Sequence, residues 1–289
     1  MPLGTRISTY LGHSNQVLGV SWSPDGSNLA SAGADETVDV WDVATGRKAL
    51  TYHGHLGWVH DVTWAPNNTW IASASGDKTV KVWDATTGET ILTYQGHSNW
   101  VQAAKWSPDG ISIASVSGDR TVQIWDVATQ ETILVVENSV WVNAVSWSPD
   151  GQYITFGADN ATVSIIDLST GSAFLTLGLP DTVFDVAWSP NGMSIASASF
   201  DGIVRVQDAN SGNTTLTCIG HTGQVLAVAW SVDGTHIASA GADKTVRLWD
   251  ITTGDNIYIY QGHTDWVNAV SWSPEGTYIA SASRDRTVQ

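Results

Sequence analysis

His97, Ser115 and Asp119 lie within 23 residues of one another and are the three residue types of a hydrolase triad. In such a triad the serine oxygen attacks a substrate, the histidine accepts the serine proton, and the aspartate orients the histidine. Trp100 and Trp125 stand nearby and could form the wall of a pocket. These residue types raise the hypothesis of nucleophilic catalysis.

The same set of residues recurs along the chain, which is typical of a structural device and not of an active site. The copies align on seven anchor tryptophans at intervals of 41 or 42 residues: Trp22, Trp64, Trp106, Trp147, Trp188, Trp230 and Trp272. Four copies add another tryptophan six residues after the aspartate. The complete sets are His13, Ser31, Asp35 and Trp41; His55, Ser73, Asp77 and Trp83; His97, Ser115, Asp119 and Trp125; and His221, Ser239, Asp243 and Trp249. We therefore predict a structural role for these tetrads and no catalytic residue among them.

Each repeat contains four short apolar runs that are rich in β-branched and aromatic residues. Turn-forming residues such as Pro66 and Asn67 separate these runs, and no segment has a sustained helical period. Four antiparallel strands in each of seven repeats predict an all-β, seven-bladed propeller, because a radial arrangement leaves only short sheet edges. The repeats run from end to end, so residues 1–289 are predicted to form one domain.

The Gly12-His13 pair, Asp35 and the Trp41-Asp42 pair resemble the WD-repeat (WD40) family of β-propellers, and the resemblance covers almost the whole chain. It implies a buried network in each tetrad, in which tryptophan donates to serine, serine to histidine and histidine to aspartate. It also implies ring closure, with residues 5–10 as an outer strand that joins the last blade. Because the chain stops two residues before the expected seventh such tryptophan, we expect a fragment of a longer protein or a trimmed chain.

Two copies depart from the tetrad pattern. Their four positions hold Asn138, Phe156, Asn160 and Ile166 in the fourth copy, and Leu179, Ser197, Asp201 and Gln207 in the fifth. We expect blades four and five to be locally weaker or differently packed, because neither can form the complete network.

Four tryptophans share a position six residues before the anchor, where a loop enters the innermost strand: Trp58, Trp100, Trp141 and Trp266. The resemblance implies that three positions per repeat contact partners on the top face of the propeller. The first contact position is that of these tryptophans, the second lies two residues later, and the third precedes the tetrad aspartate. The second position adds His60 and Phe184, and the third adds Phe200, Asp159 and Arg284. Such rings either mark an interaction site or cover the gaps between blades.

Composition restricts the partners. The 28 acidic and 12 basic side chains give a formal charge of −16, which would repel a nucleic-acid backbone. No apolar run is long enough to span a membrane, so we expect neither nucleic acid nor membrane as a partner. The lone Cys218 cannot form an internal disulfide, and no apolar leader opens the chain, so we expect a cytoplasmic protein.

These features favour a non-enzymatic scaffold that binds a protein or peptide, as the sensor or interaction domain of a larger signalling protein. A basic peptide is the predicted ligand, because cations bind tryptophan faces and the chain is acidic. The alternative is a carbohydrate-binding propeller that uses the same tryptophans. An enzyme would need a catalytic constellation outside the tetrads. We predict no metal site and no cofactor, since neither a Cys/His cluster nor a phosphate-binding glycine loop stands out.

Overall fold

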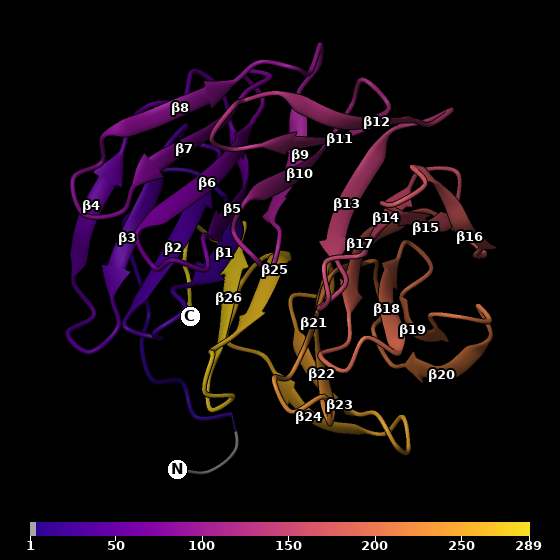
Figure 1. Cartoon of the computed structure of the whole chain (residues 1–289). Coiled ribbons are helices and arrows are strands. Elements are labelled where there is room, and N and C mark those ends of the chain that lie inside the picture. Colours follow the sequence, from indigo (N-terminus) through magenta and orange to yellow (C-terminus); the bar gives the residue numbers. More distant parts are fainter. Residues whose placement is uncertain (1–3) are drawn as a thin grey trace.

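The computed structural model describes residues 4–289, which form β-strands joined by turns and loops. Figure 1 shows the strands grouped into small sheets, or blades, around a common axis, with the first strand of each blade innermost and the fourth outermost. Within the described residues, no helix has the length and hydropathy to cross a membrane. The predicted all-β propeller class is confirmed.

The first three blades each contain four antiparallel strands that neighbour one another in chain order. Their bounds are β1 (Val17–Trp22), β2 (Asn28–Gly33), β3 (Val38–Asp42), β4 (Lys48–Tyr52), β5 (Val59–Trp64), β6 (Trp70–Ser75), β7 (Val80–Asp84), β8 (Thr90–Tyr94), β9 (Val101–Trp106), β10 (Ser112–Ser117), β11 (Thr121–Asp126) and β12 (Thr132–Glu137).

Blades four to six repeat this order. Their bounds are β13 (Val142–Trp147), β14 (Tyr153–Ala158), β15 (Thr162–Asp167), β16 (Ser172–Gly178), β17 (Val183–Trp188), β18 (Ser194–Ser199), β19 (Ile203–Asp208), β20 (Thr214–Ile219), β21 (Val225–Trp230), β22 (His236–Gly241), β23 (Val246–Asp250) and β24 (Asn256–Tyr260).

The seventh repeat forms a smaller sheet of two strands, β25 (Val267–Trp272) and β26 (Ile279–Ser283). The structure therefore has six complete four-stranded blades, and the prediction of seven is wrong in this respect. The following segment adds single bridges, in which Val288 pairs with Ala282 on one side and with Tyr10 on the other. This partial sheet, with the bridge to Tyr10, is called the seventh sheet below.

Within residues 4–10, the β-bridge to the seventh sheet is made by Tyr10. Tyr10 N–H donates to the Val288 carbonyl at 2.8 Å, and Val288 N–H donates back at 3.3 Å. Residues 5–9 have no strand pairing, so the predicted outer strand over residues 5–10 is not formed. The physical reason is the short third segment of the seventh sheet, residues 287–289. Its three residues all bond to neighbouring segments, but β7 of blade two offers five residues.

Four of the anchor tryptophans, Trp22, Trp147, Trp230 and Trp272, donate an indole hydrogen bond to a neighbouring blade, whereas the indole nitrogens of Trp64, Trp106 and Trp188 are buried without a partner. The Trp22 indole donates to the Ser271 carbonyl at 3.2 Å, and the Trp147 indole donates to the Lys105 carbonyl at 2.9 Å. In both pairs the acceptor precedes the anchor of the preceding repeat. Equivalent positions therefore lie side by side around the ring, and the innermost strands all run in the same direction. The apolar core lies between blades, as where Val40 of blade one packs with residues such as Trp64 of blade two.

Candidate functional site

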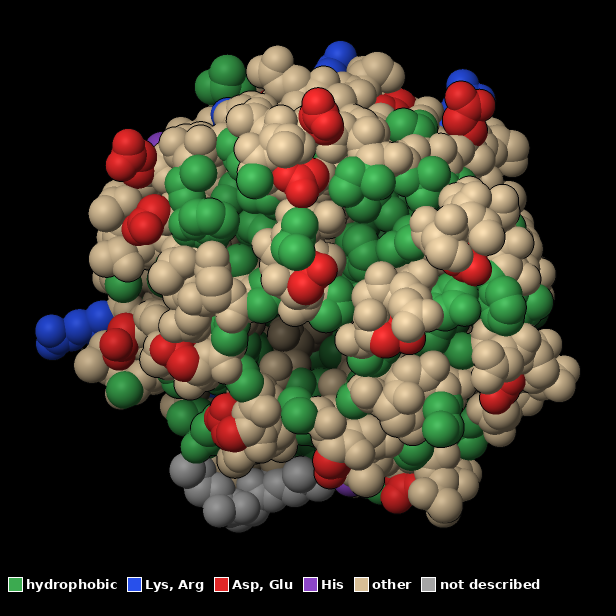
Figure 2. All heavy atoms as spheres, in the orientation of Figure 1, with side chains coloured by type: hydrophobic (Ala, Val, Ile, Leu, Met, Phe, Trp, Pro, Cys, Tyr) green, Lys and Arg blue, Asp and Glu red, His purple; other side chains and the backbone are tan. Residues whose placement is uncertain are grey.

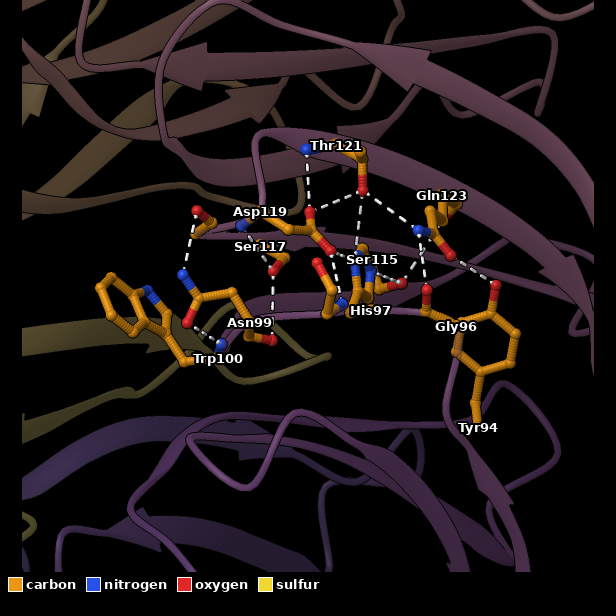
Figure 3. A network of polar contacts seen from close by, with 12 residues as sticks. Tyr94, Gly96, His97, Asn99, Trp100, Ser115, Ser117, Asp119, Thr121 and Gln123 are labelled. Carbon is orange, nitrogen blue, oxygen red and sulfur yellow. Dashed lines mark hydrogen bonds and ion pairs between the residues drawn. The ribbon is translucent and has the colours of Figure 1, made fainter.

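The tetrad of blade three is assembled as a hydrogen-bonded chain. Trp125 Nε1 donates to Ser115 Oγ at 3.3 Å, Ser115 Oγ lies 2.9 Å from His97 Nε2, and His97 Nδ1 lies 2.9 Å from Asp119 Oδ2. Figure 3 shows His97, Ser115 and Asp119 converging between the strands, with Trp100 pointing away from them. The backbone N–H of Ser98 also donates to Asp119 Oδ2, which ties the loop before β9 to the turn after β10.

The remaining sets have the same geometry. In blades one, two and six, the distance between histidine Nε2 and serine Oγ is 2.8 Å, and the closest contacts between histidine Nδ1 and aspartate lie between 2.8 and 3.1 Å. The seventh repeat brings His263, Ser281 and Asp285 together at 2.8 Å for both contacts. In this repeat the tetrad tryptophan would stand six residues after Asp285, which is past Gln289.

A threonine two residues after the aspartate is a fifth member of the network, which we did not predict from the sequence. Thr121 Oγ1 donates to Asp119 Oδ1 at 2.7 Å, and its backbone N–H donates to the same oxygen at 3.0 Å. The equivalent residues make the same side-chain bond at 2.7 or 2.8 Å: Thr37, Thr79, Thr245 and Thr287. The signal was present in the sequence, because threonine stands at this spacing in every copy that has the histidine and the aspartate.

The environment of the tetrads does not suit a nucleophile. Ser115 is fully buried and its hydroxyl oxygen lies between Trp125 and His97, so a substrate has no access to it. Burial lowers the pKa of His97. Burial alone would raise the pKa of Asp119, but hydrogen bonds from Thr121 and the Ser98 N–H, with the contact to His97, hold it below its ordinary value. The arrangement satisfies buried polar groups, which is a structural role.

Blades four and five hold no such network. In blade four Phe156 and Ile166 are buried in an apolar cluster, and Asn160 accepts a bond only from Thr162 next to it. In blade five the Gln207 amide reaches Ser197 at a long 3.4 Å, while Asp201 pairs with Arg205 at 2.7 Å. The Oε1 atom of Gln207 and Nδ2 of Asn138 are buried without a hydrogen-bond partner. The lower stability expected for these blades stays a prediction.

Aromatic stacking fastens some blades to the next. The ring of Tyr52, on the outer strand of blade one, stacks on Trp83 of blade two with centroids 4.4 Å apart. Tyr94 stacks in the same way on Trp125, at 4.3 Å. The corresponding residues of the next three outer strands are Val136, Leu177 and Cys218, none of which is aromatic.

The three contact positions of each repeat lie at one end of the blade. The N–H of the third position donates to the carbonyl of the first in all seven repeats, as from Gly76 to Trp58 at 2.8 Å. The second position is the extra residue of a β-bulge at the start of each innermost strand, as His60 is in β5. Because a bulge redirects its side chain, the three positions converge on one face, called the top face.

The most exposed aromatic side chains among these positions are Trp58, Trp141 and Phe200, which keep 53%, 48% and 47% of their surface accessible. Phe200 lies beside Phe184, with ring centroids 6.1 Å apart. Trp58 makes no ring contact with another aromatic side chain of residues 4–289. Trp141 also packs on Trp100 of the neighbouring blade, with ring centroids 5.1 Å apart. That these exposed rings form an interaction site, and do not only cover gaps between blades, stays a prediction.

Trp100 is less accessible than its position in the sequence predicts. Its ring lies against Gly118, where an added Cβ would stand 2.6 Å from the indole, and it packs edge to face on Trp141 at 5.1 Å. The predicted row of tryptophans is therefore one pair, Trp100 with Trp141, and a separate Trp58.

Trp266 is covered by the chain itself. The Arg284 guanidinium lies over its ring, 3.9 Å from the centroid, and Arg284 Nε donates to Asn268 Oδ1 at 3.2 Å. The sequence places these three residues at the contact positions of the seventh repeat but does not reveal this contact, which depends on the side-chain conformation of Arg284.

His60 is fixed by the neighbouring blade. Its Nδ1 lies 3.1 Å from the Val101 carbonyl and must carry the proton, because a carbonyl can only accept. Its pKa is lowered by burial, so the ring is neutral at pH 7 and Nε2 is an acceptor. An ideal Cβ on Gly76 would lie 3.8 Å from that Nε2 atom.

Acidic groups dominate the surface. Figure 2 shows one face of the molecule with Asp and Glu side chains scattered across it and Lys and Arg only near its rim. On the top face, Asp159 N–H bonds to the Trp141 carbonyl, and its carboxylate accepts a bond from Asn143 at 2.8 Å. The formal charge of −16 therefore favours the approach of cations to the protein as a whole.

Two aspartates on innermost strands occupy equivalent positions in different surroundings. Asp61 accepts from the Ala104 N–H of the next blade and pairs with Lys105 at 2.7 Å. Asp185 accepts from the Val228 N–H at 2.9 Å, but alanine stands where Lys105 would be. Burial raises the pKa of Asp185 to about 6.

We expect Asp185→Asn to change how stability depends on pH. A carboxyl whose folded-state pKa lies above its unfolded value of 3.8 destabilises the fold when it ionises, so wild type loses stability as pH rises through this interval. The melting temperature of the variant relative to wild type should therefore increase from pH 4 to pH 8, by the equivalent of about 1–3 kcal/mol. Parallel melting curves across that range would contradict this explanation.

Among residues 4–289, no group of three or more His, Cys, Asp or Glu side chains is placed to hold a metal ion.

Comparison with known proteins identifies the repeats. The family described as "WD domain, G-beta repeat" matches residues 4–42, 212–250 and 254–289, and the family described as "IFT122 first beta-propeller" matches residues 51–206. A stretch of 38 residues, 13% of this chain, is 47% identical to 8% of "Anaphase-promoting complex subunit cdc20" from Dictyostelium discoideum. Another of 44 residues, 15% of the chain, is 43% identical to 13% of "Uncharacterized WD repeat-containing protein sll1491" from Synechocystis.

A third stretch of 37 residues, 13% of the chain, is 57% identical to 10% of "Protein Mut11" from Chlamydomonas reinhardtii. Each match therefore spans only 8 to 13% of the length of its relative. The matched families cover most of the chain, and the propeller architecture and the four complete tetrads agree with them. The chain belongs to the WD-repeat (WD40) family of β-propeller proteins.

Proposed function

We propose that this propeller is a non-enzymatic scaffold that binds a peptide or protein of basic character through its top face. The observation that carries the proposal is the exposure of Trp58, Trp141 and Phe200 at top-face contact positions of the second, fourth and fifth repeats. Exposed aromatic rings grouped on one face are typical of interaction sites, and tryptophan is among the most frequent hot-spot residues.

Charge supports a basic ligand. The formal charge of −16 would speed the encounter with a cationic partner and make its association sensitive to salt, while ring contacts would govern the lifetime of the complex. Lysine or arginine over a tryptophan face gains about 0.5–2 kcal/mol, depending on desolvation.

An interaction role also agrees with the comparisons, since one relative is named as a subunit of a complex. We place the chain in the cytoplasm, as the sensor or interaction domain of a larger signalling protein. The alternative of carbohydrate binding would use the same rings, and binding measurements on variants of these rings separate the two.

The test is a screen of immobilised peptides of basic, neutral and acidic composition, with a glycan array in parallel. We expect basic peptides with an apolar residue to bind. The double change Trp58→Ala and Trp141→Ala should weaken their binding at least tenfold, because hot-spot truncations typically cost about 2 kcal/mol or more. The melting temperature should hardly move, since both rings are about half exposed.

Ile219→Ala is the matched control, because it also removes an exposed apolar side chain but lies on the outer strand β20. It should leave binding unchanged. Equal binding by the double variant and wild type would refute the proposed site, and glycan binding lost in the double variant would support the carbohydrate alternative instead.

A further inference from the structure

The seventh repeat contains an arginine site that the chain fills itself. Its three contact positions hold Trp266, Asn268 and Arg284, and the guanidinium lies over the indole while Nε donates to Asn268 Oδ1. The ring attracts the cation through its π-face, and the amide oxygen orients it. The seventh repeat thus shows a guanidinium group bound by the side chains of the first and second contact positions.

Blade two has the same backbone frame. The N–H of the third position donates to the carbonyl of the first at 2.8 Å in blade two, from Gly76 to Trp58, and at 2.9 Å in the seventh repeat. Ser75 Oγ donates to the Gly57 carbonyl at 3.1 Å, as Ser283 Oγ does to the Asp265 carbonyl. The first and third positions are therefore held alike in the two repeats.

The second position is also equivalent in chemistry. Asn268 donates through Nδ2 to the Val17 carbonyl of the next blade at 2.9 Å, which leaves Oδ1 to accept from Arg284. His60 donates through Nδ1 to the Val101 carbonyl at 3.1 Å, which leaves Nε2 as its acceptor beside Gly76. Both side chains use their donor on the neighbouring blade and present an acceptor to the third position.

The repeats differ at the third position. Gly76 has no side chain to lay over Trp58, whose surface is half exposed. Trp100 is unlike Trp58, because its own ring occupies the space above Gly118. Blade two thus has both the exposed ring and the acceptor that Arg284 finds in the seventh repeat.

We infer that Trp58, His60 and Gly76 form a binding site for the guanidinium group of an arginine side chain supplied by the partner. The inference rests on the proposed function, a peptide-binding top face, and names the group that blade two recognises. The arginine stacks on Trp58 and donates an N–H to His60 Nε2, in the arrangement that Arg284 adopts on Trp266 and Asn268.

The test uses the peptide Ac-Gly-Arg-Gly-NH2 as probe and the indole N–H resonances of the protein as readout, with Trp58 assigned through Trp58→Phe. The probe should shift the Trp58 resonance in a saturable way. The analogue with citrulline, which has the same shape without the charge, should bind about tenfold more weakly. His60→Asn should retain binding, whereas His60→Leu should weaken it several-fold.

The decisive variant is Gly76→Arg, which supplies the guanidinium from within the chain. A Cβ at Gly76 meets its neighbours at 3.6 Å or more, and the residue does not need the left-handed backbone region, so the fold accepts a side chain there. This variant should move the Trp58 resonance without probe and abolish the response to the probe. Gly76→Ala should respond as wild type does.

Ala242→Arg controls for charge, because it adds an arginine at the third position of blade six, where the first position is Gln224. It should leave probe binding intact. An unchanged response of Gly76→Arg, or equal shifts by the arginine and citrulline peptides, would overturn the inference. Peptides from the screen could still require Trp58 and Trp141 in that case, so the proposed function would survive its failure.

Discussion

Replacing Trp125 with alanine is expected to lower the free energy of unfolding by about 3–5 kcal/mol, more than the loss of any other side chain in its tetrad. Trp125 is fully buried, its ring stacks on Tyr94, and its indole N–H donates to Ser115. The change therefore removes apolar burial, an aromatic contact between two blades and the first link of the tetrad. Denaturant unfolding followed by circular dichroism measures the loss.

Two further variants separate the contribution of the serine hydroxyl and the contribution of ring burial to this loss of stability. Ser115→Ala leaves the ring in place and removes only the hydroxyl, so it should cost about 1–3 kcal/mol through unpaired His97 and Trp125. Trp58→Ala removes an equally large but exposed ring and should stay within about 0.5 kcal/mol of wild type. If Trp125→Ala were no more damaging than Trp58→Ala, the tetrads would not hold the blades as described.

Extending the chain after Gln289 by Val-Trp-Asp is expected to stabilise it by about 2–3 kcal/mol, the value of burying one large apolar side chain. A cavity of about 1020 Å³ lies at the seventh sheet and is lined by residues that include Tyr10, Leu29, Tyr260 and Ser281. The added indole should stack on Tyr260, as Trp125 does on Tyr94, and donate to Ser281 Oγ. The melting temperature should rise by about 4–10 °C.

Extension by Val-Ala-Asp serves as the control, because it lengthens the third segment by the same backbone without the indole. It should give at most a small part of the gain. Identical melting temperatures for the two extensions would show that the cavity does not receive the ring and that the seventh sheet is completed in another way.

Most of the fold follows from periodicity. Strands of five to seven residues, turns rich in glycine and proline, and an anchor every 41 or 42 residues leave a propeller as the arrangement that protects sheet edges. Closure was harder to foresee. A repeat pattern indicates which strands should pair. Whether residues 5–9 pair depends on how many residues after β26 are available for hydrogen bonding to them. Among the described residues, Val288 forms the bridge to the N-terminal segment, at Tyr10.

The tetrads could be predicted because all their members recur at fixed spacing, and their threonines could have been found by the same signal. The top face could be predicted only in part. Whether Trp58, Trp100 and Trp266 are open depends on the rotamer of each ring and on one neighbour, Gly118 or Arg284. The shifted pKa of Asp185 had no signal of its own, because the contrast with Asp61 emerges only when neighbouring strands are placed side by side.

The stacking of Tyr94 on Trp125 has a consequence for how propellers gain blades in evolution. Residues 94–125 lie within one repeat length of 41 or 42 residues, yet they begin on the outer strand of blade two and end in blade three. A gene segment of one repeat length that contains them therefore encodes the joint between two blades together with most of the second blade. Duplication of such a segment adds a blade that already contacts the preceding blade through this stacked pair. The propeller can therefore gain whole blades without separate mutations that create new contacts between blades.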